Sequence, residues 1–432
     1  MSFFTFKGDI RPSDAKEMTK HKAIVELKPQ KELVYPLSQH FGEPAKPIVK
    51  VKDEVKRGQM IAKANEFVSA PIFSSVSGVV TKIEPRFTPT GEKVDSIIIE
   101  NDEKYEEVEF IKVKSIDTLS KKDIIGKVQQ AGIVGLGGVG FPTHVKLSPT
   151  EPNKIEYVIA NCAESEPYLT GDYRRMLENP EELISGMNII LKLFDNASGI
   201  FGIEDNKPDC IEKLNALIKD EPRMKVVAVK TKYPQGAESQ LIYAITKRAL
   251  KYPLAPKDVG CIVNNVETMV AIHNAVINGV PLMERVVTVS GDGINEPGNF
   301  KIPIGTNHNE LIEAAGGLKE NVEKIISGGP MMGFAMFTTD VPITKTSAAF
   351  LAFTYDEVAA VTPSACINCG RCVSACPSRI IPSRVAKFAE LKDSTQFEKY
   401  SGMDCVGCGN CSFACPAKKH LKQAISAMKK LL

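Results

Sequence analysis

Near its C-terminal end the chain repeats one cysteine pattern twice. The two copies are Cys366, Cys369, Cys372, Cys376-Pro377 and Cys405, Cys408, Cys411, Cys415-Pro416. Each copy has the spacing C-x2-C-x2-C-x3-C-P, which binds a cubane iron–sulfur cluster, and two copies in tandem are typical of a two-cluster ferredoxin module. The pattern therefore predicts two [4Fe–4S] clusters and the transfer of single electrons.

The same rule predicts how the eight thiolates divide between the clusters. In two-cluster modules the fourth cysteine of each run normally binds the other cluster. The predicted ligand sets are Cys366, Cys369, Cys372 and Cys415 for one cluster, and Cys405, Cys408, Cys411 and Cys376 for the second.

Disulfide bonds and structural zinc are the other common uses of closely spaced cysteines. Disulfide frameworks suit small secreted domains, whereas this chain has 432 residues and shows no signal peptide. A zinc site usually has two C-x2-C halves with a longer spacer between them. The spacing therefore favours clusters. Cys162, Cys210 and Cys261 have no partner at ligand spacing, and we expect them to pack in the core.

Length and charge limit the remaining possibilities. At roughly 150 residues per domain, the chain should form about three domains. Lys and Arg number 54 against 52 Asp and Glu, so no overall positive field points to nucleic acid. A basic stretch at the end (Lys418, Lys419, Lys422, Lys429, Lys430) either faces an acidic electron-transfer partner or forms a solvated helix face. No apolar run approaches the roughly 18 residues of a membrane span, so we expect a peripheral protein in a reducing compartment.

Residues 1–115 are rich in short strand signals and turns. Val55-Lys-Arg-Gly58-Gln and Ser77-Gly78-Val-Val resemble the two turns of a barrel-sandwich fold, the fold of lipoyl and biotinyl carriers. Those carriers expose a modifiable lysine between two methionines, and Lys63 lacks such neighbours. We predict a docking or structural domain.

Residues 116–284 alternate strand and helix signals. We predict strands at 155–160, 199–203 and 225–229, a helix from Pro180 and another over 208–218. On the helix from Pro180, the apolar side chains on one face are Leu183, Met187, Ile190, Leu191 and Phe194. This βαβ order predicts a parallel sheet, in which ligands bind at the carboxyl ends of the strands.

Polar and glycine-rich segments gather where those strands should end. A glycine loop, Gly135-Leu-Gly137-Gly138-Val-Gly140-Phe141, precedes the sheet, and glycine lets a backbone approach a phosphate or a flat ring closely. The other segments are Asn161 to Glu166, Gly236 to Glu238, and Asn264-Asn265 to Thr268. One such segment could be ordinary helix capping, but their convergence suits the hydrogen-bonding edge of a flavin.

These motifs resemble the flavin- and NADH-binding subunit of respiratory complex I. Tyr233-Pro-Gln-Gly-Ala-Glu238, the N-terminal block and the cysteine runs narrow the resemblance to RnfC, the C-subunit family of ion-translocating ferredoxin:NAD oxidoreductases. The resemblance covers nearly the whole chain. It implies four domains: a barrel sandwich (1–115), a Rossmann-like α/β domain for FMN and NAD(H) (116–284), a β-grasp, SLBB-like module (285–345) and an α-helical two-[4Fe–4S] ferredoxin-like domain (346–432).

The resemblance also implies roles for individual residues. Those implied to surround non-covalent FMN are Gly135, Gly137, Gly138, Gly140, Lys146, Asn161, Glu164, Gly236, Glu238, Asn264, Asn265 and Thr268. Phe141 and Glu166 would face the nicotinamide nucleotide. Two departures from the complex I pattern are Ala163, where an aspartate is expected, and Ala237, where a glutamate is expected.

The implied function is an NAD-dependent oxidoreductase subunit at the cytoplasmic face of the membrane. Hydride would pass between NAD(H) and FMN, and single electrons would pass between FMN, the two clusters and ferredoxin or a partner subunit. No side chain is expected to act as acid or base. Two alternatives stay open: a soluble NADH-dependent reductase with another acceptor, and a relay subunit that has lost its flavin. In residues 285–345 we find no catalytic residues and predict mainly a spacer, with Gly328-Gly329 as a second candidate for ligand contact.

Overall fold

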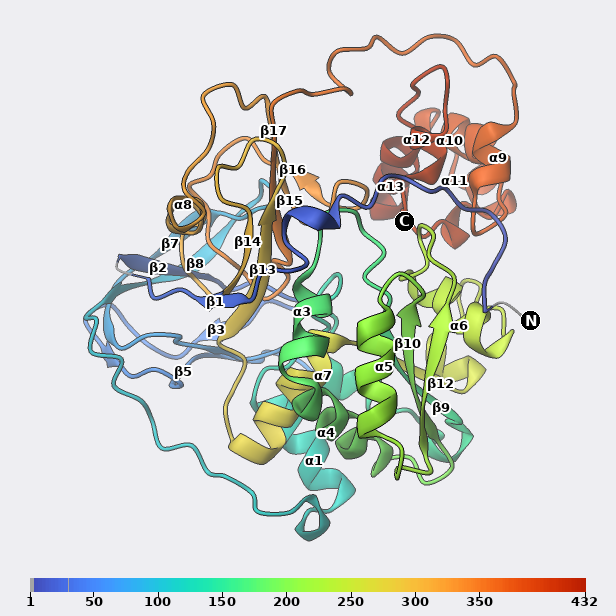
Figure 1. Cartoon of the computed structure of the whole chain (residues 1–432). Coiled ribbons are helices and arrows are strands. Elements are labelled where there is room, and N and C mark those ends of the chain that lie inside the picture. The colour runs from blue at the N-terminus through green and yellow to red at the C-terminus, as the bar shows by residue number, and fades with distance from the viewer. Residues whose placement is uncertain (1–3, 30) are drawn as a thin grey trace.

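The computed structural model describes residues 4–29 and 31–432. Within these residues the strands form four sheets, and a group of helices follows at the C-terminal end (Figure 1). The four sheets belong to three structural units of the chain.

Two small sheets pack against each other in the N-terminal part. The first has the order β2-β8-β7-β4, and the second has the order β3-β5-β6. Their strands are β2 (Glu32–Pro36), β3 (Lys46–Pro47), β4 (Glu54–Val55), β5 (Met60–Lys63), β6 (Ile72–Phe73), β7 (Gly78–Phe87) and β8 (Lys93–Asn101). Tyr35, Ile61, Ile72 and Ile97 are buried between the sheets and form one hydrophobic core.

A parallel four-stranded sheet follows. Its order is β11-β10-β9-β12, and its strands are β9 (Tyr157–Cys162), β10 (Ser198–Glu204), β11 (Met224–Val229) and β12 (Cys261–Asn265). The predicted parallel sheet is therefore confirmed. The first strand was predicted two residues too early, because a 3-10 turn at Pro152–Lys154 occupies the approach and Ile155 ends that turn.

Helices cover both faces of this sheet. They are α1 (Lys121–Gln130), α2 (Thr143–Lys146), α3 (Gly171–Glu178), α4 (Pro180–Leu191), α5 (Pro208–Leu217), α6 (Glu238–Thr246) and α7 (Val266–His273). The apolar face predicted for the helix from Pro180 is buried, as are Cys162, Cys210 and Cys261. In proteins most of the stability of a helix comes from packing such an apolar face against the rest of the fold.

The third unit is a six-stranded sheet with the order β1-β14-β13-β17-β15-β16. Its elements are β1 (Ile24–Glu26), β13 (Glu284–Ser290), β14 (Gly298–Pro303), β15 (Lys324–Ser327), β16 (Phe334–Ala335), β17 (Ala349–Phe353) and helix α8 (His308–Ala314). β1 comes from the N-terminal end and β17 lies beyond residue 345, yet both pair with strands of this sheet. The predicted domain limits by residue number stay a prediction.

The C-terminal part is helical. Its helices are α9 (Arg371–Ala375), α10 (Pro382–Glu390), α11 (Ser394–Lys399), α12 (Asn410–Phe413) and α13 (Leu421–Leu431). The two cysteine runs have matching local structure, because α9 begins after Gly370 and α12 after Gly409, both in the left-handed region. Glycine tolerates this backbone conformation without strain.

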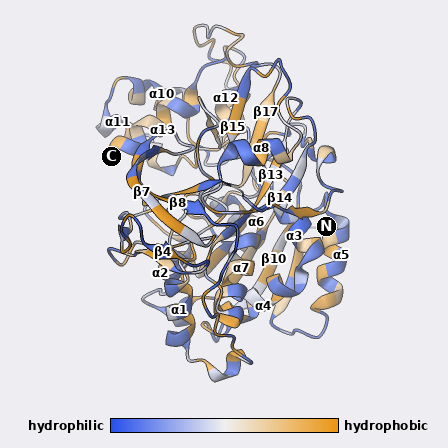
Figure 2. Cartoon of the chain, turned by 90° about the vertical axis from the view of Figure 1, so that its left-hand side faces the viewer, coloured by the Kyte–Doolittle hydropathy of each residue, from blue (hydrophilic) through white to orange (hydrophobic). Residues whose placement is uncertain are grey.

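Short helical turns connect these elements. They are η1 (Lys16–Met18), η2 (Ile116–Thr118), η3 (Pro152–Lys154), η4 (Pro256–Val259), η6 (Gly402–Asp404) and the π-helical η5 (Asn274–Asn278). Figure 2 shows that β13, β15 and β17 are largely hydrophobic and that α5 alternates between hydrophobic and hydrophilic residues. Among the described residues, no helix is both long and apolar enough to cross a membrane.

The N-terminal segment runs beside two other parts of the chain (Figure 1). Phe4 forms a bridge with Val229 at the end of β11, and Ile10 forms one with Tyr233. Between them, Gly8 lies so close to the Cys376 carbonyl that a Cβ atom on Gly8 would be 2.2 Å from the oxygen. The segment therefore contacts both the parallel sheet and the helical part that carries the cysteines.

Candidate functional site

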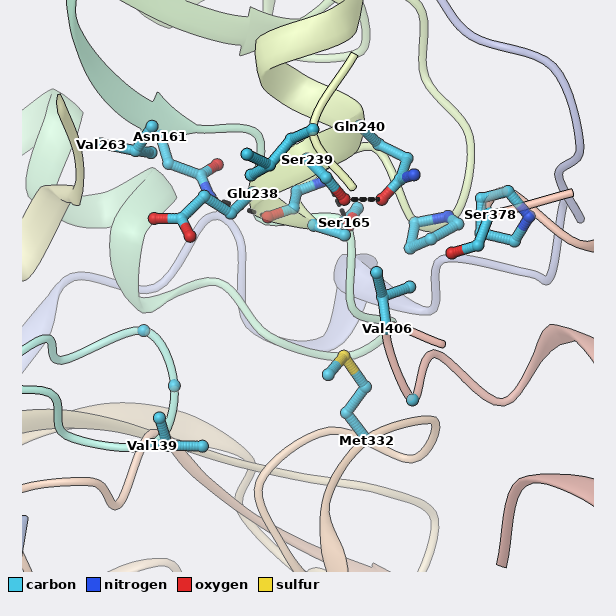
Figure 3. Close-up of a pocket in the computed structure, with 18 of the residues that line it drawn as sticks. Val139, Asn161, Ser165, Glu238, Ser239, Gln240, Val263, Met332, Ser378 and Val406 are labelled. Atoms are coloured by element: carbon cyan, nitrogen blue, oxygen red, sulfur yellow. Dashed lines mark hydrogen bonds between the residues drawn. The ribbon is translucent and has the colours of Figure 1, made fainter. Parts of the chain in front are cut away.

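A cavity of about 1540 Å³ lies at the carboxyl ends of β9, β11 and β12. Of the residues predicted to bind the cofactor, those that line it are Gly135, Gly137, Gly138, Gly140, Phe141, Lys146, Asn161, Glu164, Glu166, Gly236, Glu238, Asn264 and Asn265. Figure 3 shows Asn161, Ser165 and Glu238 on one side of the cavity and Met332 and Val406 on the other. The structure therefore brings together residues that are far apart in the sequence.

The glycine loop is a tight turn closed at its base. Gly135 N donates a hydrogen bond of 2.9 Å to Phe141 O, and Val134 pairs with Pro142. A Cβ atom on Gly137 would lie 2.9 Å from Asn265 Cβ, whereas one on Gly138 would meet nothing within 4 Å. Gly137 is thus packed against protein, and Gly138 faces open space.

Among the residues predicted to bind FMN or the nucleotide, Thr268 alone does not line the cavity. It is fully buried, and its hydroxyl accepts a hydrogen bond of 3.0 Å from the backbone N–H of Leu136. Thr268 therefore supports the glycine loop from behind.

Lys146 and Asn161 are held by backbone carbonyls around the cavity. Lys146 Nζ donates to Val263 O at 3.2 Å and lies 3.4 Å from Glu238 Oε1. Asn161 Nδ2 donates to Gly236 O at 2.8 Å. These contacts join α2 to β12 and α6, and the end of β9 to the segment before α6.

The amide of Asn264 is the clearest sign that this cavity takes a polar ligand. Asn264 lines the cavity and is 2 % exposed, and neither its Nδ2 nor its Oδ1 has a hydrogen-bond partner among the described residues. An unpaired buried amide costs about 1–3 kcal/mol. A flavin, whose ring edge and ribityl chain carry both donors and acceptors, fits this amide and the open space at Gly138.

Glu164 and Glu166 are both buried, but they make different contacts. The Glu164 carboxylate accepts hydrogen bonds from the backbone N–H groups of Asp172 and Tyr173, at 2.7 and 3.3 Å, and so caps α3. Glu166 accepts from the N–H groups of Met331 and Met332, at 3.2 and 2.9 Å. Burial raises the pKa of each carboxyl group, and these N–H donors act in the opposite direction.

Through its contact with Glu166, a loop of the six-stranded sheet forms part of the cavity wall. Met331 and Met332 lie in the loop from Gly328 to Gly333 between β15 and β16, and Met332 lines the cavity. A Cβ atom on Gly329 would lie 2.2 Å from Glu166 Oε2. The sequence predicted mainly a spacer role for this loop, because no pattern near Gly328 indicates a contact with Glu166.

Ala163 and Ala237 lie beside the cavity without polar side chains. The backbone carbonyl of Ala163 accepts a hydrogen bond of 2.7 Å from Lys207 Nζ. Ala237 lines the cavity directly before α6 and gives that helix no side-chain cap. The cavity is thus open although alanine stands at both positions where the complex I pattern has an acidic residue.

The predicted ligand set Cys405, Cys408, Cys411 and Cys376 lies in the helical part. Among the described residues no three His, Cys, Asp or Glu side chains form a group that could hold a metal ion, so this set stays a prediction. Burial, and then the nearby sulfurs of Cys405, Cys411 and Cys376, raise the pKa of Cys408 to about 12. Cys376, Cys405 and Cys411 also pack in one cluster of apolar side chains. Cys405 also lines the large cavity.

The other predicted set lies at the surface. Cys366 and Cys369 are exposed, while Cys372 and Cys415 are half-buried. Burial, and then the charges of nearby thiols that include Cys372, raise the pKa of Cys411 to about 12. The two sets are thus neighbours, with the Cys405 set on the side of the cavity.

Tyr233 connects the cavity to the helical part, and our sequence reasoning did not include it among the site residues. Its hydroxyl lies 2.8 Å from Cys408 O, to which it donates, and 3.3 Å from Glu166 Oε1. The signal that could have found it was its position in the Tyr233-Pro-Gln-Gly segment.

Four family models match successive parts of the chain. They are the RnfC barrel sandwich hybrid domain (residues 4–104), the Nuo51 FMN-binding domain (128–274), the SLBB domain (286–335) and the 4Fe-4S dicluster domain (365–419). The C subunit of the proton-translocating ferredoxin:NAD(+) oxidoreductase complex of Clostridium ljungdahlii is 46% identical over 98% of this chain and 93% of the relative. The chain belongs to this family of C subunits.

Further relatives agree with this assignment. The C subunit of the Na(+)-translocating ferredoxin:NAD(+) oxidoreductase complex of Acetobacterium woodii is 42% identical over 99% of this chain and 96% of its own length. The C subunit of the ion-translocating oxidoreductase complex of Vibrio cholerae is 36% identical over 92% of this chain, which spans 52% of that longer relative. The resemblance inferred from the motifs is therefore confirmed, as is the expected set of domains.

One solved structure shows the same fold in a member of another class of enzyme. A chain of an NAD+-reducing [NiFe]-hydrogenase superposes with a TM-score of 0.52, at 20% identity, over 72% of this chain and 63% of that chain. At this identity the likeness concerns the fold.

Proposed function

We propose that this C subunit is the NADH-, FMN- and iron–sulfur-containing electron-transfer subunit of a membrane-bound ferredoxin:NAD oxidoreductase complex. One observation carries the proposal: a single cavity is lined by the glycine loop, by the unpaired Asn264 amide and by Cys405 of a predicted cluster. In this proposal the flavin site and a cluster ligand share one continuous space. Membership of the C-subunit family supports the coupling of this protein to ion translocation by the whole complex.

FMN, when bound, exchanges a hydride with NAD(H) and passes electrons one at a time to iron–sulfur clusters. The residues of the chain bind and orient. Gly137 and Gly138 let the backbone come close to the cofactor, and Lys146 brings a positive charge to the cavity. Phe141, with Phe41 5.6 Å from it between ring centroids, offers an aromatic surface to the nucleotide.

The assignment of Glu166 to the nucleotide remains part of this proposal. Because its carboxylate already accepts the N–H groups of Met331 and Met332, a nucleotide must either use its remaining lone pairs or displace the loop. The loop therefore belongs to the nucleotide end of the cavity in this proposal.

The finer organisation is also proposed. We assign a Rossmann-like domain to residues 116–284, a β-grasp module to 285–345, and the two four-cysteine sets to separate clusters. Partners would be the other subunits of the complex and ferredoxin, with the protein held peripherally on the cytoplasmic face. Cys405, Cys408, Cys411 and Cys376 would hold the cluster nearer to the flavin, because Cys405 lines the cavity and Cys366 and Cys369 lie at the surface.

An anaerobic titration with NADH tests the proposal. The protein, reconstituted with FMN, iron and sulfide, should lose its flavin absorbance and its cluster absorbance together. Cys369→Ala should reduce the cluster signal and leave the reduction of flavin by NADH intact. Ser374→Ala, an exposed change in the same segment, is the control. Protein that retains clusters but binds no flavin and ignores NADH would leave only a relay subunit.

A further inference from the structure

We propose that Lys16, in the N-terminal segment, is a positioning residue of the flavin cavity that acts through Glu164. The inference rests on the proposed function, because it concerns the same cavity. It deepens that function by assigning a role to a residue that lies outside the FMN-binding family model and far from it in the sequence.

Lys16 is buried beneath the segment that follows β9. It is 5 % exposed, and its ammonium donates hydrogen bonds to the backbone carbonyls of Glu166, at 3.0 Å, and Leu169. The same Nζ lies 3.9 Å from Glu164 Oε2, and both side chains are almost wholly buried. Lys16 thus supplies a positive charge to a segment that carries two buried carboxylates.

Neighbouring contacts hold the N-terminal segment against residues 164–170, which follow β9. Tyr168 N donates a hydrogen bond of 2.7 Å to Asp14 O, and the hydroxyls of Thr19 and Thr170 are 2.7 Å apart. Lys16 is therefore one of several contacts between residues 14–19 and residues 164–170. Its distinctive contribution is charge.

Glu164 transmits the effect of Lys16 to the cavity wall. Its carboxylate caps the first turn of α3 through the N–H of Asp172, at 2.7 Å. The side chain of Asp172 accepts a hydrogen bond of 2.5 Å from Asn265 Nδ2. Asn265 in turn packs against Gly137, where a Cβ atom would be 2.9 Å from Asn265 Cβ. A continuous set of contacts thus joins Lys16 to the glycine loop.

Lys16 and Glu164 compensate each other's charge in a buried place. Around Glu164 lie the cations Lys16 and Lys207, and Glu204 adds further negative charge. Removing one member of a buried ion pair leaves an uncompensated charge and is strongly unfavourable. Without Lys16, Glu164 would add net negative charge to the cavity wall and lose the cation that holds it in place.

A charge placed this way has a signature in the flavin midpoint potential. Reduction of a flavin adds negative charge to it. Extra negative charge in the cavity wall therefore lowers the flavin midpoint potential, and removing negative charge from the wall raises that potential. Lys16→Met should lower the potential, Glu164→Gln should raise it, and the double variant should return near the wild-type value. A purely structural role of Lys16 would not produce this reversal.

Affinity for FMN provides a second measurement. Lys16→Met should weaken FMN binding about tenfold, the size of effect expected for strongly coupled contacts. The two single-variant effects should be non-additive in the double variant. The control is Lys20→Met, because Lys20 lies in the same segment but pairs with Glu17 at the surface; it should match wild type in both measurements.

The outcomes are distinguishable. Equal potentials and FMN affinities in wild type and Lys16→Met would overturn the role of Lys16. If Lys16→Met does not fold, the comparison uses Glu164→Gln and the double variant, which leaves neither charge of the pair unpaired. Equal flavin potentials in Glu164→Gln and the double variant would also overturn the role of Lys16. Wild-type protein that binds no FMN would overturn the proposed function itself, and this assignment with it.

Discussion

The hydroxyl of Tyr233 donates a hydrogen bond of 2.8 Å to the backbone carbonyl of Cys408 and so joins the wall of the large cavity to a predicted cluster ligand. Ile10 and Asn410 pack around the same contact: Ile10 exchanges backbone hydrogen bonds with Tyr233, and Asn410 Nδ2 donates to Ala375 O at 3.1 Å. The contact sets the position of the Cys408 loop relative to the cavity.

Tyr233→Phe should therefore slow electron transfer from flavin to cluster. The change leaves the Cys408 carbonyl unpaired in a buried place, at a cost of about 1–3 kcal/mol, and lets the loop move. Anaerobic stopped-flow mixing with NADH would follow the flavin and cluster absorbances separately. We expect an unchanged flavin phase and a slower cluster phase. Equal cluster phases in wild type and variant would contradict the positioning role, and Tyr252→Phe, an exposed tyrosine of the same cavity, serves as control.

The two central glycines of the loop should respond differently to alanine. Gly137→Ala places a Cβ atom 2.9 Å from Asn265, so it should lower both the stability of the protein without cofactor and its affinity for FMN. Gly138→Ala meets no protein atom within 4 Å, so it should lower the affinity alone. Thermal unfolding of the cofactor-free protein and FMN titration measure the two quantities. A Gly138→Ala variant with wild-type FMN affinity would place the cofactor elsewhere.

Glu166→Gln should loosen the loop between β15 and β16. Glutamine has one acceptor oxygen, whereas Glu166 uses both of its oxygens for the N–H groups of Met331 and Met332. Amide hydrogen exchange of residues 329–333 should become faster, and that of β13 should stay unchanged. Glu320→Gln, an exposed change in the same part of the chain, should leave both rates as they are. Equal exchange rates at residues 329–333 in wild type and Glu166→Gln would show that the loop is held by other contacts.

Asp172 should make stability depend on pH. Burial, and then the charges of Glu164 and Glu267, raise the pKa of Asp172 from 3.8 to about 8. A carboxyl group with a raised pKa in the folded state binds its proton more tightly there than in the unfolded state. Its contribution to stability is thus full below about pH 4 and is lost as the pH rises through about 8.

Asp172→Asn removes this dependence, because asparagine can still accept the Asn265 hydrogen bond without ionising. The melting temperature of this variant should fall less than that of wild type between about pH 5 and about pH 9. Asp220→Asn, which changes an exposed carboxylate, should keep the wild-type profile. Parallel profiles for Asp172→Asn and wild type would mean that Asp172 is ionised throughout.

Local patterns in the sequence predicted much of this protein and failed at its long-range contacts. The glycine loop, the helix from Pro180 and the cysteine runs have signals within a few residues of one another, so their structures could be anticipated. Lys16 carries no such signal, because its partners at 164–169 lie far along the chain. The pairing of Glu166 with Met331 and Met332 was missed for the same reason. Thr268 was expected to surround the cofactor but supports Leu136, a distinction that depends on which way one side chain turns.

The pairing of β1 with β14 affects the order in which the molecule can be completed. β1 is synthesised long before its partner strand β14, which ends at Pro303, and the sheet is complete only when β17 has also been made. During translation β1 therefore has no partner strand until β14 has been made. An unpaired strand edge can pair with strands of other chains. A gene fragment that stops before residue 298 would leave this edge open permanently. Gly8 lies on the same N-terminal segment and approaches Cys376, so this segment reaches its last contacts only after most of the described chain has been made.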